Sequence, residues 1–394
     1  MKRLTIKNIG PLKEVDIALS RINLIIGPQS TGKSCILKIA SFCAWLENEI
    51  EFGLHKSVKL SRKIIDENLV DFYNLEGYTS EESSFAYDTN TMKFSFSFKD
   101  DTSTFEWKKG RWDYKRSKIA YIIAERNVLS VVPNWYELNF PNNSILNFLK
   151  EFQNARNYLR GKNTLPILNM GIKYDYDSQS GIDKILLKDG KELKLQNVSS
   201  GLQSLVPLYV LIDYMTNGVF KLDMRSVKDQ EMTQSIYNQL KKEYPSSNNS
   251  SQDALIKILN FFTNYDHSDI YLEEPEENLF PETQMDLVNW LAEIVNGERE
   301  HSLFIATHSP YIMSAFNNLI QAGDIIEESP EKTDEVEKII GGHRALKYED
   351  VAAFAIADGS VHRIMDDELK LMEPSELDTV SDDIANVFNK LLDL

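Results

Sequence analysis

The chain has 394 residues, of which 42% are hydrophobic and 10% aromatic; this composition excludes a disordered protein and suits one large domain with an insertion, or two domains. Its net charge of −17 opposes long-range attraction to nucleic acid, although a local basic groove would still bind it. No apolar stretch approaches a membrane span and the N-terminus lacks the apolar run of a signal peptide, so we expect a cytoplasmic protein without a membrane partner.

The first predicted elements surround a phosphate-binding pattern. Residues 4–9 and 15–19 are expected to form two short strands, and a buried strand over 21–26 leads toward a helix that begins near residue 35. The segment between that strand and that helix fits G-x-x-x-x-G-K-[ST], in which glycines let main-chain N–H groups converge on phosphate. The predicted ATP-binding residues are Gly27, Pro28, Gln29, Ser30, Thr31, Gly32, Lys33, Ser34 and Cys35.

Two of these side chains have predicted tasks at the triphosphate. Lys33 brings a cation to the β- and γ-phosphates, and the Ser34 hydroxyl is suited to bind Mg²⁺. The chain's two cysteines, Cys35 and Cys43, lie about two turns apart on the expected helix, so they cannot bridge each other there. We expect both to be buried thiols in a reducing compartment.

Residues 46–118 are interpreted as an insertion. Helical spacing with many charges runs from 45 to 78 and is expected to form an arm, and a period of two over 85–114 predicts an antiparallel hairpin or small sheet. Structural elaboration is favoured over a dedicated partner-binding surface for this segment.

Further elements follow in the order strand, helix, strands and linker. Residues 118–124 predict a buried strand whose polar end, at Glu125 to Asn127, lies where ligands bind in α/β sheets. Residues 135–160 predict a helix, 165–195 more strands, 224–253 a polar linker, and 375–392 an acidic amphipathic helix. We expect residues 1–45 and 119–330 to form the ATPase core, 46–118 the insertion, and 331–394 a C-terminal extension.

Two further buried strands end in residues suited to phosphate chemistry. The strand over 269–272 is followed by Glu273, predicted to hold Mg²⁺, and by Glu274, predicted to polarise the attacking water. Because neighbouring side chains on a strand point in opposite directions, each acid is able to serve one task. The strand over 303–307 precedes His308, whose imidazole is predicted to sense the γ-phosphate.

A second anion site is predicted where a helix begins near residue 203. Its residues are small, hydroxylic or amide-bearing, and they are Ser199, Ser200, Gly201 and Gln203. Each of these motifs is weak alone. Their order along the chain is much more specific than any one of them.

That order resembles the ABC-class ATPases of the SMC/RecF/OLD branch over roughly residues 1–45 and 119–330. Residues 199–203 resemble the family signature Leu-Ser-Gly-Gly-Gln, with Ser199 and Leu202 as departures. Glu273 replaces the family aspartate, Asn278 and Phe280 replace two family histidines, and no plain glutamine loop is evident near Glu125. The resemblance implies an α/β P-loop ABC-type head, with a mixed sheet flanked by helices and with an inserted helical arm plus a small antiparallel sheet.

The resemblance also implies how such a protein works. Two heads of a homodimer enclose two ATP molecules with Mg²⁺, and the signature of one head touches the γ-phosphate held by the other. With no intact Toprim nuclease pattern after residue 330 and no long coiled coils, the chain looks like the stand-alone ATPase subunits of anti-phage systems of the Septu, PARIS and retron-associated type. We expect a homo-oligomeric sensor and scaffold that controls a separate effector, a toxin or nuclease from a neighbouring gene.

The sequence also allows two alternative functions. The first is a RecF-like DNA repair ATPase, for which the best candidate patch consists of Lys108, Lys109, Arg111, Lys115, Arg116 and Lys118; a solvated sheet face is the favoured interpretation of that patch. The second is a transporter ATPase subunit, against which the Glu-Pro-Glu stretch and the insertion argue.

Overall fold

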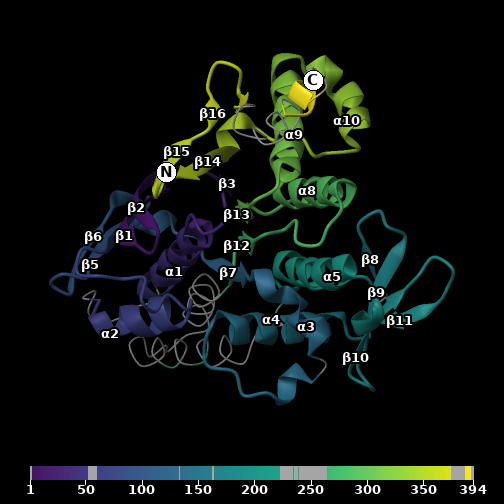
Figure 1. The fold of residues 1–394 in the computed structure, drawn as a ribbon, viewed down its shortest axis with the longest axis horizontal. Coiled ribbons are helices and arrows are strands. Elements are labelled where there is room, and N and C mark those ends of the chain that lie inside the picture. The colour runs from purple at the N-terminus through teal and green to yellow at the C-terminus, as the bar shows by residue number, and fades with distance from the viewer. Residues whose placement is uncertain are drawn as a thin grey trace, which may run out of the picture.

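The computed structural model describes residues 2–51, 60–132, 134–161, 164–221, 264–373 and 387–391, together with Gln234 and Asn238. One mixed sheet of 11 strands, in the order β6-β5-β4-β1-β2-β15-β14-β3-β13-β12-β7, dominates this part of the chain. Helices flank it, and a separate antiparallel sheet of four strands lies at one end of the molecule (Figure 1). The predicted fold class, a mixed sheet flanked by helices together with a small antiparallel sheet, is confirmed.

Five parallel strands form the part of the large sheet that carries the motifs. They are β3 (Ile22–Ile26), β7 (Ser117–Ile122), β12 (His267–Glu273), β13 (Ser302–Thr307) and β14 (Val351–Ala357). Most of their side chains are buried, which is why they form nearly continuous apolar runs in the sequence. Strand β13 pairs in parallel with β3 on one side and with β12 on the other. The carboxyl ends of these three strands therefore meet at one edge, where α/β sheets bind ligands.

An antiparallel wing extends the same sheet. Its strands are β1 (Lys2–Ile9), β2 (Leu12–Leu19), β4 (Ser84–Asp88), β5 (Met92–Ser97) and β6 (Thr102–Trp107). Strand β15 (Ser360–Arg363) joins this wing to the rest of the sheet, because it pairs with β14 in antiparallel and with β2 in parallel orientation. The hairpin predicted within 85–114 forms, but β4 pairs with β1, so these strands lengthen the large sheet and do not make a sheet of their own. The alternating phenylalanines of this wing pack together, with Phe85 edge-on to Phe94 and stacked on Phe96.

The helices around the large sheet are α1 (Lys33–Glu51), α2 (Arg62–Ile65), α8 (Pro281–Val295), α9 (Pro310–Glu328) and α10 (Thr333–Ile340). The helical spacing noted between 45 and 78 corresponds to the end of α1, to α2 and to a π-helical turn at Asp66–Asp71, and residues 52–59 lie outside the described part. Within the described residues, every helix is too short or too polar to cross a membrane.

A mixed helical and β segment separates β7 from β12. It contains α3 (Val128–Val131), α4 (Ser144–Leu159), α5 (Ser200–Asp213) and the small sheet of β8 (Leu165–Ile167), β9 (Ile172–Asp177), β10 (Ile182–Leu186) and β11 (Glu192–Lys194). The strands predicted within 165–195 are therefore present. Helix α4 begins nine residues later than predicted, because the Asn143 side chain accepts from the N–H of Leu146 and caps it there, while Trp135–Glu137 form a 3₁₀ turn.

The strand pairing carries the core beyond the expected limit at residue 330. Strand β14, from the stretch expected to be an extension, pairs in parallel with β3, which leads into the phosphate-binding loop. The C-terminal strands thus lie beside the N-terminal ones (Figure 1). At its other limit, the expected insertion starts inside α1, which runs unbroken to Glu51. The linker expected over 224–253 and most of the helix expected over 375–392 lie outside the described residues.

Candidate functional site

The phosphate-binding segment lies between β3 and α1, where its sequence predicts it. Gly32 has a φ of +106°, and a Cβ atom at this position would lie 2.6 Å from Leu12, so the turn needs glycine. Ser30 also has a positive φ, of 61°, which draws the loop into a tight curve. The first-turn N–H groups of α1 are left free to meet an anion at this end of the helix.

The remaining residues of this segment differ in exposure. Pro28 and Gln29 are exposed, while the Thr31 hydroxyl donates to the main-chain oxygen of Pro28 over 2.9 Å and so braces the loop. Ser34 is half-buried in the first turn of α1. Burial raises the pKa of the Cys35 thiol to about 12, so Cys35 is an uncharged core residue that supports the helix, as predicted for both cysteines.

The ammonium group of Lys33 folds back over the loop. Its Nζ atom donates to the main-chain oxygens of Gly27 and Pro28, both at 2.8 Å, and lies 3.2 Å from Nδ1 of His308. Burial lowers the pKa of Lys33 to about 8, against the opposing effect of the nearby carboxylates of Glu274 and Glu276. The ammonium group is therefore still mostly charged at neutral pH. Phosphate oxygens would be able to replace the loop carbonyls as its hydrogen-bond acceptors.

The two acids at the end of β12 point in different directions. The buried carboxylate of Glu273 accepts from the Tyr121 hydroxyl at 2.6 Å and from the N–H of Ala124 at 3.3 Å. Glu274 leaves the strand with a φ of +43°, and its Oε1 atom lies 3.5 Å from Nε2 of His308. The expected divergence of the pair is thus present, produced by a left-handed residue at the strand end.

The imidazole of His308 is held between Lys33 and Glu274. Glu276 fixes the end of β13, because its carboxylate accepts from the Thr307 hydroxyl at 2.9 Å and from the N–H of His308 at 2.5 Å. A neutral imidazole that accepts from Lys33 at Nδ1 carries its proton on Nε2, which faces Glu274. Residues that are more than 240 positions apart in the sequence are therefore joined in one chain of polar contacts.

Helix α5 begins at the second predicted anion site. Ser199 caps it by accepting from the N–H of Leu202 at 3.5 Å, and both Ser199 and Ser200 are exposed. The Gln203 amide donates to the main-chain oxygens of Gln196 and Val198, so this side chain closes the preceding turn. In the described part of the chain, no hydrogen bond or ion pair joins residues 199–203 to residues 27–34.

Arg126 connects helix α5 to the acids of β12. Its side chain is fully buried, and its guanidinium donates to the main-chain oxygens of Ser204 at 3.1 Å, Glu273 at 3.0 Å and Glu274 at 2.7 Å. A second link is formed by Asn278, whose amide donates to the Ser204 hydroxyl at 3.0 Å. The start of helix α5 is thus fixed to the loop that follows β12.

The residues predicted to hold Mg²⁺ fit such an ion in donor chemistry. Ser34 offers a hydroxyl and Glu273 a carboxylate, and Mg²⁺ bound with a nucleotide needs only one or two protein ligands beside phosphates and water. Groups of three or more His, Cys, Asp or Glu able to cage a metal are absent from the described residues, which is compatible with an ion that is shared with a triphosphate. When bound, the ion would neutralise charge on the β- and γ-phosphates.

Four residues of this site were not predicted from the sequence: Tyr121, Arg126, Glu276 and Asn278 all touch the acids, the histidine or helix α5. Arg126 and Glu276 stood inside segments that were already singled out, directly after buried strands, and that position is the signal that should have marked them. Tyr121 lies within a strand as an ordinary apolar-run residue, and nothing in its local sequence marks it.

No protein-family model matches the sequence, and no curated protein matches it. Among solved structures, the chain is similar to an SMC head domain from Thermotoga maritima (11% identity, TM-score 0.39, covering 92% of this chain and 97% of that one). It is also similar to a dimeric bacterial ABC transporter cassette (11%, TM-score 0.30, 91% and 97%) and to the recombination mediator protein RecF (10%, TM-score 0.34, 92% and 97%). Likeness at this level says nothing about the activity of this chain.

Proposed function

We propose that the chain is a P-loop ATPase of the ABC class that binds ATP with Mg²⁺ and hydrolyses it. The observation that carries the proposal is the contact chain from Lys33 through His308 to Glu274, which spans 3.2 Å and 3.5 Å at the carboxyl ends of three adjacent strands. A cation suited to phosphate, a partly exposed carboxylate that is able to polarise water, and an imidazole beside both form a set of groups suited to water attack on a γ-phosphate.

In this proposal, each group has one role. Residues 27–35 and the α1 N-terminus hold the phosphates, Ser34 and Glu273 hold Mg²⁺, Glu274 orients and polarises the water, and His308 reads the γ-phosphate. Because Lys33 already lies between the loop carbonyls and His308, arrival of a triphosphate would exchange its acceptors and change the surroundings of His308.

The working unit in this proposal is a homodimer or a higher homo-oligomer. Ser199, Ser200, Gly201 and Gln203 lie on the α5 end, and the exposure of the two serines suits contact with a nucleotide held by a second copy. Arg126 would carry the resulting movement of α5 to Glu274 within the same chain. ATP then stabilises the assembly, and its hydrolysis loosens it.

We further propose that this ATPase acts in prokaryotic anti-phage defence as a sensor and scaffold for a separate effector from a neighbouring gene, a toxin or nuclease. The net charge of −17 suits a basic partner protein. Co-expression with the adjacent gene product, followed by purification with and without ATP, tests this part independently of the chemistry. A partner that joins only the ATP-bound Glu274→Gln protein would support it, and a homo-oligomer without a partner in either state would count against it.

Direct binding of duplex DNA is not favoured by the structure around the candidate basic patch. Lys115 pairs with Glu300 at 2.8 Å, Lys118 pairs with Glu151 at 2.8 Å, Lys108 pairs with Asp88, and Arg116 is buried. Cations that are already neutralised release few counterions from DNA. Among the members whose side chains are described, Lys109 and Lys115 are exposed, and Lys115 is already paired with Glu300.

The ATPase proposal is tested by phosphate release and light scattering. Wild-type protein with ATP and Mg²⁺ should release phosphate at a rate per chain that rises with protein concentration, because each site needs a second copy. Lys33→Ala should abolish nucleotide binding and release. A wild-type protein that binds no nucleotide would overturn the proposal, and turnover that is independent of concentration, at concentrations where light scattering shows a monomer, would overturn the shared site alone.

A further inference from the structure

A cavity of about 510 Å³ lies away from the nucleotide site, between helix α4, the 3₁₀ turn at Trp135–Glu137 and the small sheet. Helix α4 contributes one face to it, since Leu146, Leu149, Lys150 and Gln153 follow each other at intervals of three, one and three residues. The volume falls in the range of about 300–1,000 Å³ that is usual for small-molecule sites. None of the residues proposed for the nucleotide lines this cavity.

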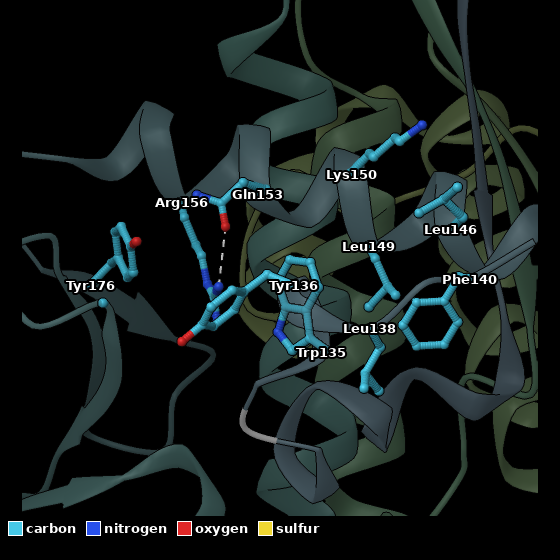
Figure 2. A pocket seen from close by; sticks show the side chains of 11 residues that line it. Trp135, Tyr136, Leu138, Phe140, Leu146, Leu149, Lys150, Gln153, Arg156 and Tyr176 are labelled. Carbon is cyan, nitrogen blue, oxygen red and sulfur yellow. Dashed lines mark hydrogen bonds between the residues drawn. The ribbon is translucent and has the colours of Figure 1, made fainter. Parts of the chain in front are cut away.

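The lining is mostly apolar and aromatic. Figure 2 shows Leu138, Phe140 and Leu149 grouped together, with Trp135 and Tyr136 beside them. Leu138 is 48% and Tyr136 64% exposed, so the apolar surface continues from the cavity onto its mouth. A ligand with an apolar body would remove this surface from water, which favours a complex.

The polar groups in the lining are mainly hydrogen-bond donors. Lys150 carries an exposed ammonium group that makes no ion pair among the described residues. Trp135 is only 6% exposed, and its buried indole N–H has no hydrogen-bond acceptor among the described residues. The Gln153 amide oxygen accepts from Arg156 at 3.2 Å (Figure 2), which leaves its NH₂ group as the free end. Aspartate and glutamate are absent from the lining.

Arg156 belongs to the wall and does not serve as a free cation. Its guanidinium pairs with Asp183 in a buried contact and lies 5.1 Å from the centre of the Trp135 ring. Lys150 is therefore the cation that remains available to a ligand. A donor-rich lining with one unpaired cation and no carboxylate fits an anion and disfavours a cation.

We propose that this cavity binds a small carboxylate with an apolar or aromatic body, whose charged end pairs with Lys150 and whose body packs against Trp135, Leu138 and Phe140. The proposal does not depend on the proposed ATPase function, because the cavity and the nucleotide site share no residue. The buried Trp135 N–H offers a second contact for a ligand oxygen that reaches it.

Calorimetric titration of the full chain with octanoate and with 4-phenylbutyrate tests this proposal. Both should bind saturably at one site per chain, whereas octylamine should not. Lys150→Met should weaken binding of the carboxylates about tenfold, as expected for the loss of one partly desolvated ion pair. Lys173→Met, which removes an exposed lysine outside the cavity, is the matched control and should change nothing.

A second variant tests whether the ligand occupies the cavity itself. Leu146→Trp fills the cavity without changing charge, and it should abolish binding while the protein keeps its unfolding midpoint within a few degrees. Lys33→Ala should bind octanoate as the wild type does, so failure of the ATPase proposal and failure of this one are distinguishable. Absence of saturable binding by both carboxylates, equal binding of octylamine, or full affinity in Lys150→Met would overturn the proposal.

Discussion

The guanidinium group of Arg126 donates to the main-chain oxygen of Glu274 over 2.7 Å, and the same side chain holds the carbonyl of Ser204 at the start of α5. One fully buried residue therefore ties the proposed water-activating acid to the proposed signature helix. In the proposed shared-site ATPase, Arg126 would connect the helix that meets the neighbouring copy with the acid that activates water.

Arg126→Lys should separate these two elements. The compact ammonium group cannot span three carbonyls, and buried oxygens that lose a donor cost free energy. We expect the free energy of unfolding to fall by about 3 kcal/mol and ATP turnover to fall about tenfold. Urea unfolding and phosphate release measure these effects, and Arg160→Lys on the exposed end of α4 is the matched control. Stability equal to that of the wild type would show that the three contacts are dispensable.

Glu274→Gln should uncouple binding from hydrolysis. The amide keeps the shape of the side chain but takes up no proton from water, so turnover should fall by about 10²–10⁴ while ATP affinity is retained. The variant should then accumulate as an ATP-bound oligomer, seen by light scattering. Glu282→Gln, an exposed acid at the start of α8, is the control. Normal turnover in Glu274→Gln would assign water activation to another group.

ATP affinity should fall as the pH rises above about 8. Burial lowers the pKa of Lys33 to about 8, and the phosphates prefer the charged form, so binding takes up a proton above that pH. The dissociation constant should then rise by about tenfold for each pH unit until the pKa of the bound form is reached. Titration of a fluorescent ATP analogue from pH 6.5 to 10 measures this. Lys33→Arg stays charged, so its affinity, although lower, should not change over the same range.

Ser200→Asp should impair only the shared site. The residue is exposed, so folding and nucleotide binding by a single copy should be unchanged, while a carboxylate facing a partner's γ-phosphate costs several kcal/mol. Concentration-dependent turnover should be lost, whereas Gln196→Asp, a nearby exposed control, should retain it. Retained turnover in Ser200→Asp would mean that α5 does not meet nucleotide in the assembly.

Gly201→Asp is a less selective test of whether α5 meets the nucleotide of a second copy. A Cβ atom at Gly201 would lie 2.9 Å from the main-chain oxygen of Asn278, so any side chain there must displace the loop after β12 within its own copy. This variant should therefore lose turnover for two reasons: the displaced loop moves Glu274 in the same copy, and the new carboxylate repels the nucleotide held by the partner copy. Equal single-copy nucleotide affinity in Gly201→Asp and Ser200→Asp would show that the loop tolerates the shift.

The sequence by itself determined the elements whose signals are local. The phosphate-binding segment needs glycine at residue 32 and a cation at residue 33. Continuous apolar runs, such as those before Glu273 and His308, indicate buried strands. These strands and the loop follow from the backbone rules of neighbouring residues, which is why they were predictable. The divergence of Glu273 from Glu274 was expected from strand alternation, but the left-handed backbone of Glu274, just after the strand, produces it.

The tertiary structure alone decided which distant residues meet. The pairing of β14 with β3 brought residues beyond 330 into the core, and the pairing of β4 with β1 joined the expected insertion to the main sheet. Arg126 and Tyr121 gained their partners because strands β7 and β12 lie side by side, a choice made by packing and loop closure over about 150 residues of chain. The contacts of Arg126 and Tyr121 produce no periodic pattern in the sequence, because each depends on a single residue near the end of a strand.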